Sequence, residues 1–130
     1  MKTKPNLIQT CVLSAAMLHA VSSQAQPVTK AAGGYYHSIF LKSDGSLWAM
    51  GYNAPGQLGD GTNNNTNRPE QIVASGVTAI AAGDQHNLFL KTDSSLWAVG
   101  YKVWGQLGDG TYNQTNRPKP YPCSRKLISG

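Results

Sequence analysis

The sequence predicts an all-β fold, a partial β-propeller of two blades, and the chief evidence is an internal duplication. The stretch Gly-Gln-Leu-Gly-Asp-Gly-Thr at residues 56–62 recurs letter for letter at residues 105–111, an offset of 49 residues. At this offset, segments 32–69 and 81–118 are identical at roughly two positions in three. Repeats of this length are typical of propellers and solenoids, in which each unit buries apolar surface against the next.

Short apolar runs bounded by turn residues predict the inner strands of each unit. They lie at residues 37–42, 47–51, 86–91 and 96–100. Asp44-Gly45 indicates a hairpin turn in the first unit, and Asp93-Ser94 is a weaker signal for the same turn in the second. Leu47 and Trp48 point to opposite faces of one strand, so both faces of the sheet need cover. Blades stacked on both sides would provide it.

Glycine- and asparagine-rich connections at residues 52–68 and 101–117 are expected to be ordered loops. Their glycines would take positive φ angles, and Asp60 would hold its own turn rather than bind calcium. An outer strand is expected at residues 71–73. The second unit has residues 119–123 in the matching region, where Pro120 and Pro122 remove donors from the strand ladder.

The first 25 residues have the pattern of a signal peptide. Lys2 and Lys4 precede an apolar stretch at residues 7–21, and Ser23-Gln24-Ala25 offers small residues for cleavage after Ala25. The alternative is an amphipathic helix retained in the mature protein. With a signal peptide the protein would be secreted, periplasmic or extracellular, and its mature form would not insert into a membrane.

The expected mature chain has little net charge and no basic face. Without Lys2 and Lys4, nine basic residues stand against six acidic ones, and three of the nine are in the last dozen residues. Nucleic-acid binding needs Lys and Arg gathered on one surface, so this class of function is disfavoured.

The remaining boundaries follow from the repeat. We expect a linker at residues 26–30, a first repeat at 31–79, an incomplete second repeat at 80–122 and a degenerate tail at 123–130. Cys123 would be the one cysteine left after cleavage, so it would be free, pair with another chain, or lack its partner.

The repeated elements resemble the regulator-of-chromosome-condensation (RCC1) repeat, whose unit combines a small-residue strand, a His, an Asp-Gly turn, an aromatic strand and Gly-Gln-Leu-Gly. In the first unit these are Gly34, His37, Asp44-Gly45, Trp48, Gly51, residues 56–59 and Pro69. In the second they are residues 81–83, His86, Asp93, Trp97, Gly100, residues 105–108 and Pro118.

The resemblance implies a closed propeller, usually of seven blades with four strands each. Two repeats fall short of a ring, so we expect a truncated copy or a fragment. The alternatives are that several chains assemble, or that two blades stand open and self-associate through their exposed faces.

Family members include a nuclear guanine-nucleotide exchange factor, an ultraviolet sensor and a secreted inhibitor of β-lactamases, so the resemblance does not fix a function. The leading hypothesis is an exported, non-catalytic module that binds an unidentified protein. The alternative is a purely structural repeat of a longer surface or secreted propeller, and an exchange-type regulator comes third by family analogy.

No catalytic, cofactor or metal site is expected. Residues 56–61 lack the Lys-Ser/Thr ending of a phosphate loop. His37 and His86 recur once per repeat without further metal ligands, so each is interpreted as bonding a backbone acceptor in its own blade.

Binding residues are sought where the two repeats differ at exposed turns. Four large aromatic residues stand at such positions, and side chains of this kind are enriched at binding hot spots. They are Tyr35, Tyr36, Trp104 and Tyr112. The alternative is ordinary drift of loop sequence, with aromatic rings that cover neighbouring blades.

Overall fold

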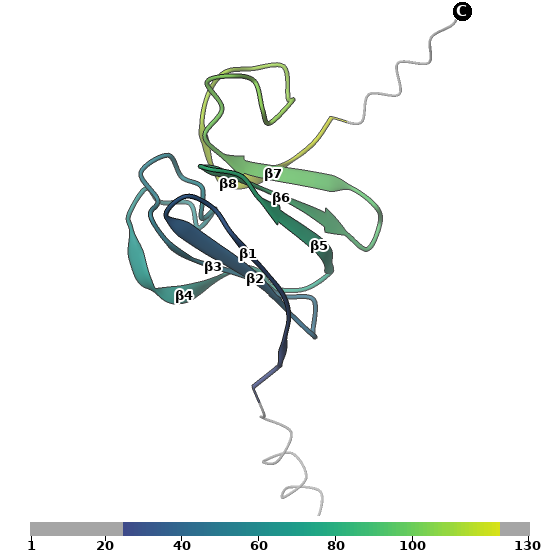
Figure 1. The fold of residues 1–130 in the computed structure, drawn as a ribbon. Helices are drawn as coiled ribbons and strands as arrows, with labels where there is room; N and C mark the ends of the chain where they lie inside the picture. The colour runs from purple at the N-terminus through teal and green to yellow at the C-terminus, as the bar shows by residue number, and fades with distance from the viewer. Residues whose placement is uncertain (1–24, 123–130) are drawn as a thin grey trace, which may run out of the picture.

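A computed structural model describes residues 25–122 as eight strands in two four-stranded antiparallel sheets (Figure 1). Sheet one contains β1 (Val28–Gly33), β2 (His37–Lys42), β3 (Leu47–Gly51) and β4 (Thr66–Val73). Sheet two contains β5 (Val77–Ala82), β6 (His86–Lys91), β7 (Leu96–Gly100) and β8 (Thr115–Pro120). Strands pair in chain order within each sheet, so the predicted all-β fold of two blades is confirmed.

Several expectations lie outside the described residues. These are the signal peptide up to residue 24 and the tail at residues 123–130 with its cysteine. Within residues 25–122 there is no helix with the length and apolar character of a membrane span.

The hairpin turn between the inner strands is built alike in both blades. Asp44 Oδ1 accepts hydrogen bonds from the backbone N–H of Ser46 (2.9 Å) and from its hydroxyl (2.6 Å), and the Ser46 Oγ accepts one from Trp48 Nε1. Gly45 has a φ of 78°, and Ser94 takes the same left-handed conformation with a φ of 64°. The weaker turn signal at Asp93-Ser94 therefore still forms the turn, because Asp93 makes the same bonds to Ser95.

The outer strands differ from the sequence expectation in two respects. Strand β4 begins at Thr66, five residues before the expected start, and β8 forms although it ends in a proline. Pro118 and Pro120 are tolerated because β8 is an edge strand, with one side that needs no donor. Strand β8 lies mostly before the proline-containing region singled out by sequence and ends at Pro120, the first of the two prolines in that region.

The sheets also begin earlier than the expected repeat boundaries. Strand β1 starts at Val28, inside the stretch expected to be a linker, and β5 starts at Val77. Val28 aligns with Val77 at the repeat offset, so the structural unit includes a few residues before the region of strongest sequence identity.

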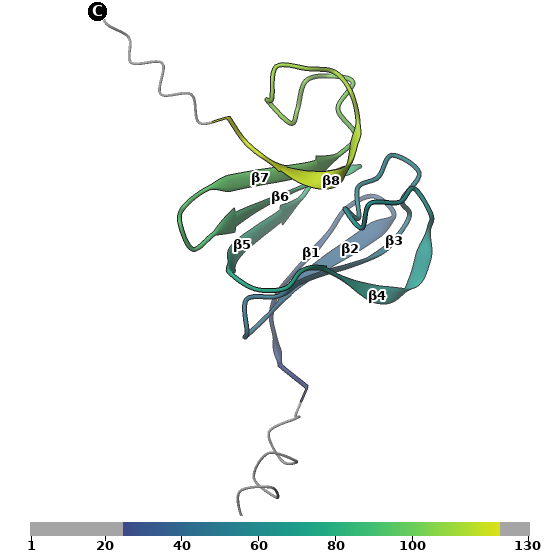
Figure 2. The same cartoon turned by 180° about the vertical axis from the view of Figure 1, so that it is seen from behind.

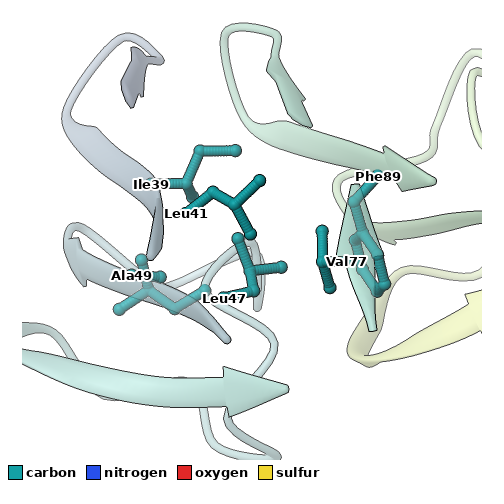
Figure 3. Packing of buried hydrophobic residues seen from close by; sticks show 7 residues of the cluster. Ile39, Leu41, Leu47, Ala49, Val77 and Phe89 are labelled. Atoms are coloured by element: carbon teal, nitrogen blue, oxygen red, sulfur yellow. The ribbon is translucent and has the colours of Figure 1, made fainter. Parts of the chain in front are cut away.

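The core lies between the two blades, which pack face to face (Figures 2 and 3). Blade 1 contributes a layer of aliphatic side chains that we call its front face: Ile39, Leu41, Leu47 and Ala49. Blade 2 covers it with a layer that we call its back face: Val77, Ile80, Ala82, Phe89 and Trp97. Both blades have the same strand register, and successive cross-strand pairs point to opposite faces of a sheet. The pair Ile39–Ala49 lies on the front face of blade 1, whereas Phe89–Trp97 lies on the back face of blade 2.

Truncation of equivalent leucines will show how much of the stability comes from this contact. Leu41 is 4% exposed and its counterpart Leu90 is 38% exposed. In dilute solution Leu41→Ala should lower the free energy of unfolding by about 2–5 kcal/mol, since it leaves a cavity between the blades. Leu90→Ala should cost roughly 1 kcal/mol or less, because less area is returned to water. Urea unfolding measures both, and equal losses would contradict this packing.

Candidate functional site

The aromatic residues singled out by sequence lie in the loops that join the strands at one end of the blades. Tyr35 and Tyr36 form the β1–β2 turn, where their rings meet edge to face with centroids 4.3 Å apart. Gly34 makes this turn possible, because a Cβ there would lie 2.0 Å from the ring of His37. Tyr36 also contacts Tyr52, with centroids 6.2 Å apart, through a connection held by the bond from Tyr52 N to Tyr36 O.

Trp104 and Tyr112 belong to the long loop that follows β7. The side chain of Trp104 is 83% exposed, and its backbone N–H donates to Gln106 Oε1 at 3.0 Å. The Tyr112 ring lies beside Gly105, since a Cβ on that glycine would be 3.6 Å from Tyr112 Cε1. Both aromatic side chains are therefore displayed by one loop of blade 2.

A hollow lies beside Trp104 at this end of blade 2. It is lined by six residues of blade 2: Asp84, Gln85, His86, Tyr101, Trp104 and Gln106. The backbone of Tyr35 in blade 1 lies next to one lining residue, because its N–H donates to the carbonyl of Asp84 at 3.0 Å. Figures 1 and 2 agree that the long loops of both blades emerge at this same end.

Sequence reasoning did not select Tyr52, Tyr101, Asp84 or Gln85 for this surface. The two tyrosines are identical in the repeats, so a search for differences passes over them. Asp84 and Gln85 do differ from their counterparts, but they are not aromatic. Asp84 and Gln85 could have been found from the repeat alignment, because they occupy the turn positions that match Tyr35 and Tyr36.

The loop of blade 1 is held by a buried amide. The Asn53 side chain donates to Asp60 Oδ1 (3.1 Å) and to the Thr62 carbonyl (3.2 Å), and its Oδ1 accepts from Leu58 N (2.9 Å). Asp60 holds its own turn, as predicted, by accepting from Thr62 N. Partial burial raises the pKa of Asp60, but the bonds from Thr62 and Asn53 outweigh it and leave the pKa below its ordinary value.

The loop of blade 2 replaces that amide with an ion pair. Lys102, at the position of Asn53, is fully buried, and its Nζ contacts the Asp109 carboxylate and the Thr111 hydroxyl. The bond from Lys102 lowers the pKa of Asp109 to about 2. The glycines of both loops take positive φ as predicted, so the same backbone path is anchored by different chemistry.

The two histidines have different surroundings. His37 Nε2 lies 2.9 Å from Asn87 Oδ1 of the neighbouring blade, and Asn87 Nδ2 donates to the Gln57 carbonyl. The interpretation that His37 bonds a backbone acceptor in its own blade is therefore wrong: this buried position joins two blades through side chains. His86 instead lines the open hollow, where burial of its ring lowers its pKa more than Asp84 raises it.

The described part of the chain holds no cluster of three or more His, Cys, Asp or Glu side chains suited to a metal. Within it, His37 Nδ1 and the side-chain amide atoms of Gln57 are buried without a protein hydrogen-bond partner.

Two meandering four-stranded sheets stacked face to face, with loops gathered at one end, define a pair of β-propeller blades. The RCC1 repeat model (regulator of chromosome condensation) matches residues 44–90, and a second model of the same repeat matches residues 28–57. The protein is an RCC1-like repeat protein with two repeats.

Proteins similar to this chain are much longer. A Caenorhabditis elegans homologue of the X-linked retinitis pigmentosa GTPase regulator is 47% identical over 53 residues, which are 41% of this chain and 4% of that protein. The crystal structure of human WBSCR16 has a TM-score of 0.71 at 28% identity and covers 79% of this chain and 27% of its own. Saccharomyces cerevisiae Prp20p has the same TM-score at 18% identity, covering 80% and 27%, and shows the fold alone.

The ion pair of the blade 2 loop predicts a response to acid. The folded-state pKa of Asp109 is about 2 against an ordinary 3.8, so its contribution to stability is present above pH 3.8 and is lost as the pH falls toward 2. Lys102→Asn copies blade 1 and removes the main cause of the shift. Urea midpoints between pH 5 and 2 should fall less in this variant than in the wild type, and identical slopes would refute the assignment.

Proposed function

We propose that this chain is an exported, non-catalytic module that binds another protein through the loop end of its two blades. The observation that carries the proposal is the exposure of aromatic side chains in that region. Tyr35, Tyr36, Trp104 and Tyr112 are all largely exposed, on loops whose backbone is fixed by glycines and buried anchors. Large, rigid side chains of this type bury much area on binding at a small cost in side-chain entropy.

The chemistry around these rings favours a protein partner over a small apolar ligand. The hollow beside Trp104 contains a carboxylate, two amides and an imidazole, all able to pair with backbone or polar side chains. Tyr35 and Tyr36 add two exposed phenol groups on the adjoining turn of blade 1. An aromatic anchor surrounded by polar groups is the usual composition of a protein interface.

Relatives give this proposal general support. Prp20p was described together with its binding to Gsp1p and histones, and yeast RCC1 (Prp20) was solved bound to Kap60. Those properties belong to proteins of which this chain spans about a quarter, 27% and 26% of their lengths. We therefore propose protein binding as the class of activity, with an unidentified partner, and neither nucleic-acid binding nor membrane insertion.

A purely structural role is the second candidate function. It is favoured by the two outward sheet faces, which carry apolar side chains such as Leu90 (38% exposed) and Val28 (54% exposed). In that case the chain would serve as a repeat unit of a larger propeller or surface assembly, and its loops would have no partner of their own.

Substitution of Trp104 will distinguish these candidates. Proteins retained by the immobilised chain from the extracellular fraction of the producing cells should fall at least about tenfold with Trp104→Ala, and similarly with Tyr35→Ala. Val103→Ala is the matched control, because Val103 is an exposed apolar residue of the same loop. Circular dichroism verifies the fold. An unchanged set of retained proteins with Trp104→Ala would favour the structural role.

Export is tested separately by the mass of the mature protein. If residues 1–25 are a signal peptide, protein recovered outside the cytoplasm should begin at Gln26, and Ala25→Arg should block processing because the site requires a small residue. Intact protein that retains residues 1–25 in the cytoplasm would rule out this part of the proposal.

A further inference from the structure

The contact between the two blades shows which surfaces of this protein fit together. It is asymmetric: the front face of blade 1 meets the back face of blade 2. Figure 3 shows Leu41 and Leu47 of blade 1 pointing toward Val77 of blade 2, with Ile39 and Phe89 in the same cluster. Each blade therefore has one face of each kind, and only one face of each blade is used inside the chain.

The front face of blade 2 is open but has nearly the same composition as the covered one. Leu88, Leu90, Leu96 and Ala98 occupy the positions of Ile39, Leu41, Leu47 and Ala49. Part of this face is an apolar hollow of about 230 Å³, lined by Ala79, Ile80, Ala81, Leu88, Phe89, Leu90 and Leu96. In blade 2 no back face covers this layer: Leu90 is 38% exposed, Leu88 and Leu96 are half-buried, and Ala98 is buried within its own blade.

The back face of blade 1 is also open, and it is built like the one in use. Phe40 stacks near Trp48 with ring centroids 6.4 Å apart, and Lys42 Nζ lies 3.9 Å from the centre of the indole. In blade 2 the corresponding distances are 6.2 Å between Phe89 and Trp97 and 3.7 Å for the lysine.

The exposure of two equivalent valines also shows that this face is open in blade 1 and covered in blade 2. Val77 is 4% exposed inside the contact, whereas its counterpart Val28 is 54% exposed on the open back face. The open face of blade 1 therefore presents the groups that blade 2 uses to cover a front face.

The backbone hydrogen bond between the two blades could also form between two copies of the chain. The Gly45 carbonyl accepts a hydrogen bond from Val77 N at 3.0 Å. Gly45 has a positive φ, and Ser94, at the same turn position of blade 2, has a positive φ as well. The matching bond between two copies would join Ser94 O to Val28 N. Such bonds do not depend on side-chain identity, so they persist where the repeats differ in sequence.

We propose that a second copy of this chain docks head to tail, with the front face of blade 2 of one molecule against the back face of blade 1 of the next. The contact is weaker than the internal one, because Ala31 and Gly33 replace Ile80 and Ala82 and bury less apolar area. Since the two faces differ, the association is heterologous and extends to a ring or a filament rather than stopping at a symmetric dimer. The proposal concerns the sheet faces and is independent of a partner bound at the loop end.

Two charged variants, each blocking one face, test the proposal by analytical ultracentrifugation over a concentration series. Leu90→Asp blocks the front face of blade 2, and Ala31→Asp blocks the back face of blade 1; both positions are exposed, so each variant should fold. Wild type should show species larger than a dimer as concentration rises. Each variant alone should stay monomeric. Asn64→Asp, a charge at an exposed loop position, should assemble like the wild type.

The mixture of the two blocked variants gives the decisive result. Each retains the face that the other lacks, so an equimolar mixture should form a heterodimer and nothing larger. A symmetric contact between like faces would instead leave one variant dimeric by itself. A wild type that stays monomeric at every concentration, a blocked variant that still assembles, or a mixture without heterodimer would each overturn the proposal.

Discussion

A four-stranded sheet with two apolar faces is not stable alone in water, and each blade of this protein is such a sheet. The contact between the two blades covers one of the two apolar faces of each sheet. It buries Ile39, Leu47 and Phe89 almost completely, and it places the loops of both blades at one end. The candidate binding surface therefore depends on the same contact that forms the core.

The loops show that one backbone path can be held by unlike side chains. Glycines with positive φ shape both loops, yet Asn53 anchors one through amide hydrogen bonds and Lys102 anchors the other through a buried ion pair. Because the anchors sit inside the loops, their outer residues can change without altering the path. Trp104 and Tyr112 occupy such outer positions, which is how two repeats with the same loop backbone present different surfaces.

Much of the fold could be predicted from the sequence, because the duplication gives the repeat and the apolar runs give the inner strands. Outer strand β4 could not be bounded correctly, since Thr66 and its neighbours are polar and lie on an exposed edge. Strand β8 was obscured by its prolines, whose effect depends on position in the sheet. The role of His37 was also hidden, because its partner Asn87 belongs to the other blade and aligns with a serine, Ser38.

The identical stretches at residues 56–62 and 105–111 have a consequence for changes in the number of repeats. A chain joined from one stretch to the other would gain or lose one module of 49 residues. The junction would fall within a loop that both modules already share, and each inserted blade would meet its neighbours through faces that already fit. Copy number can therefore change in evolution, or by design, without any redesign of the interior.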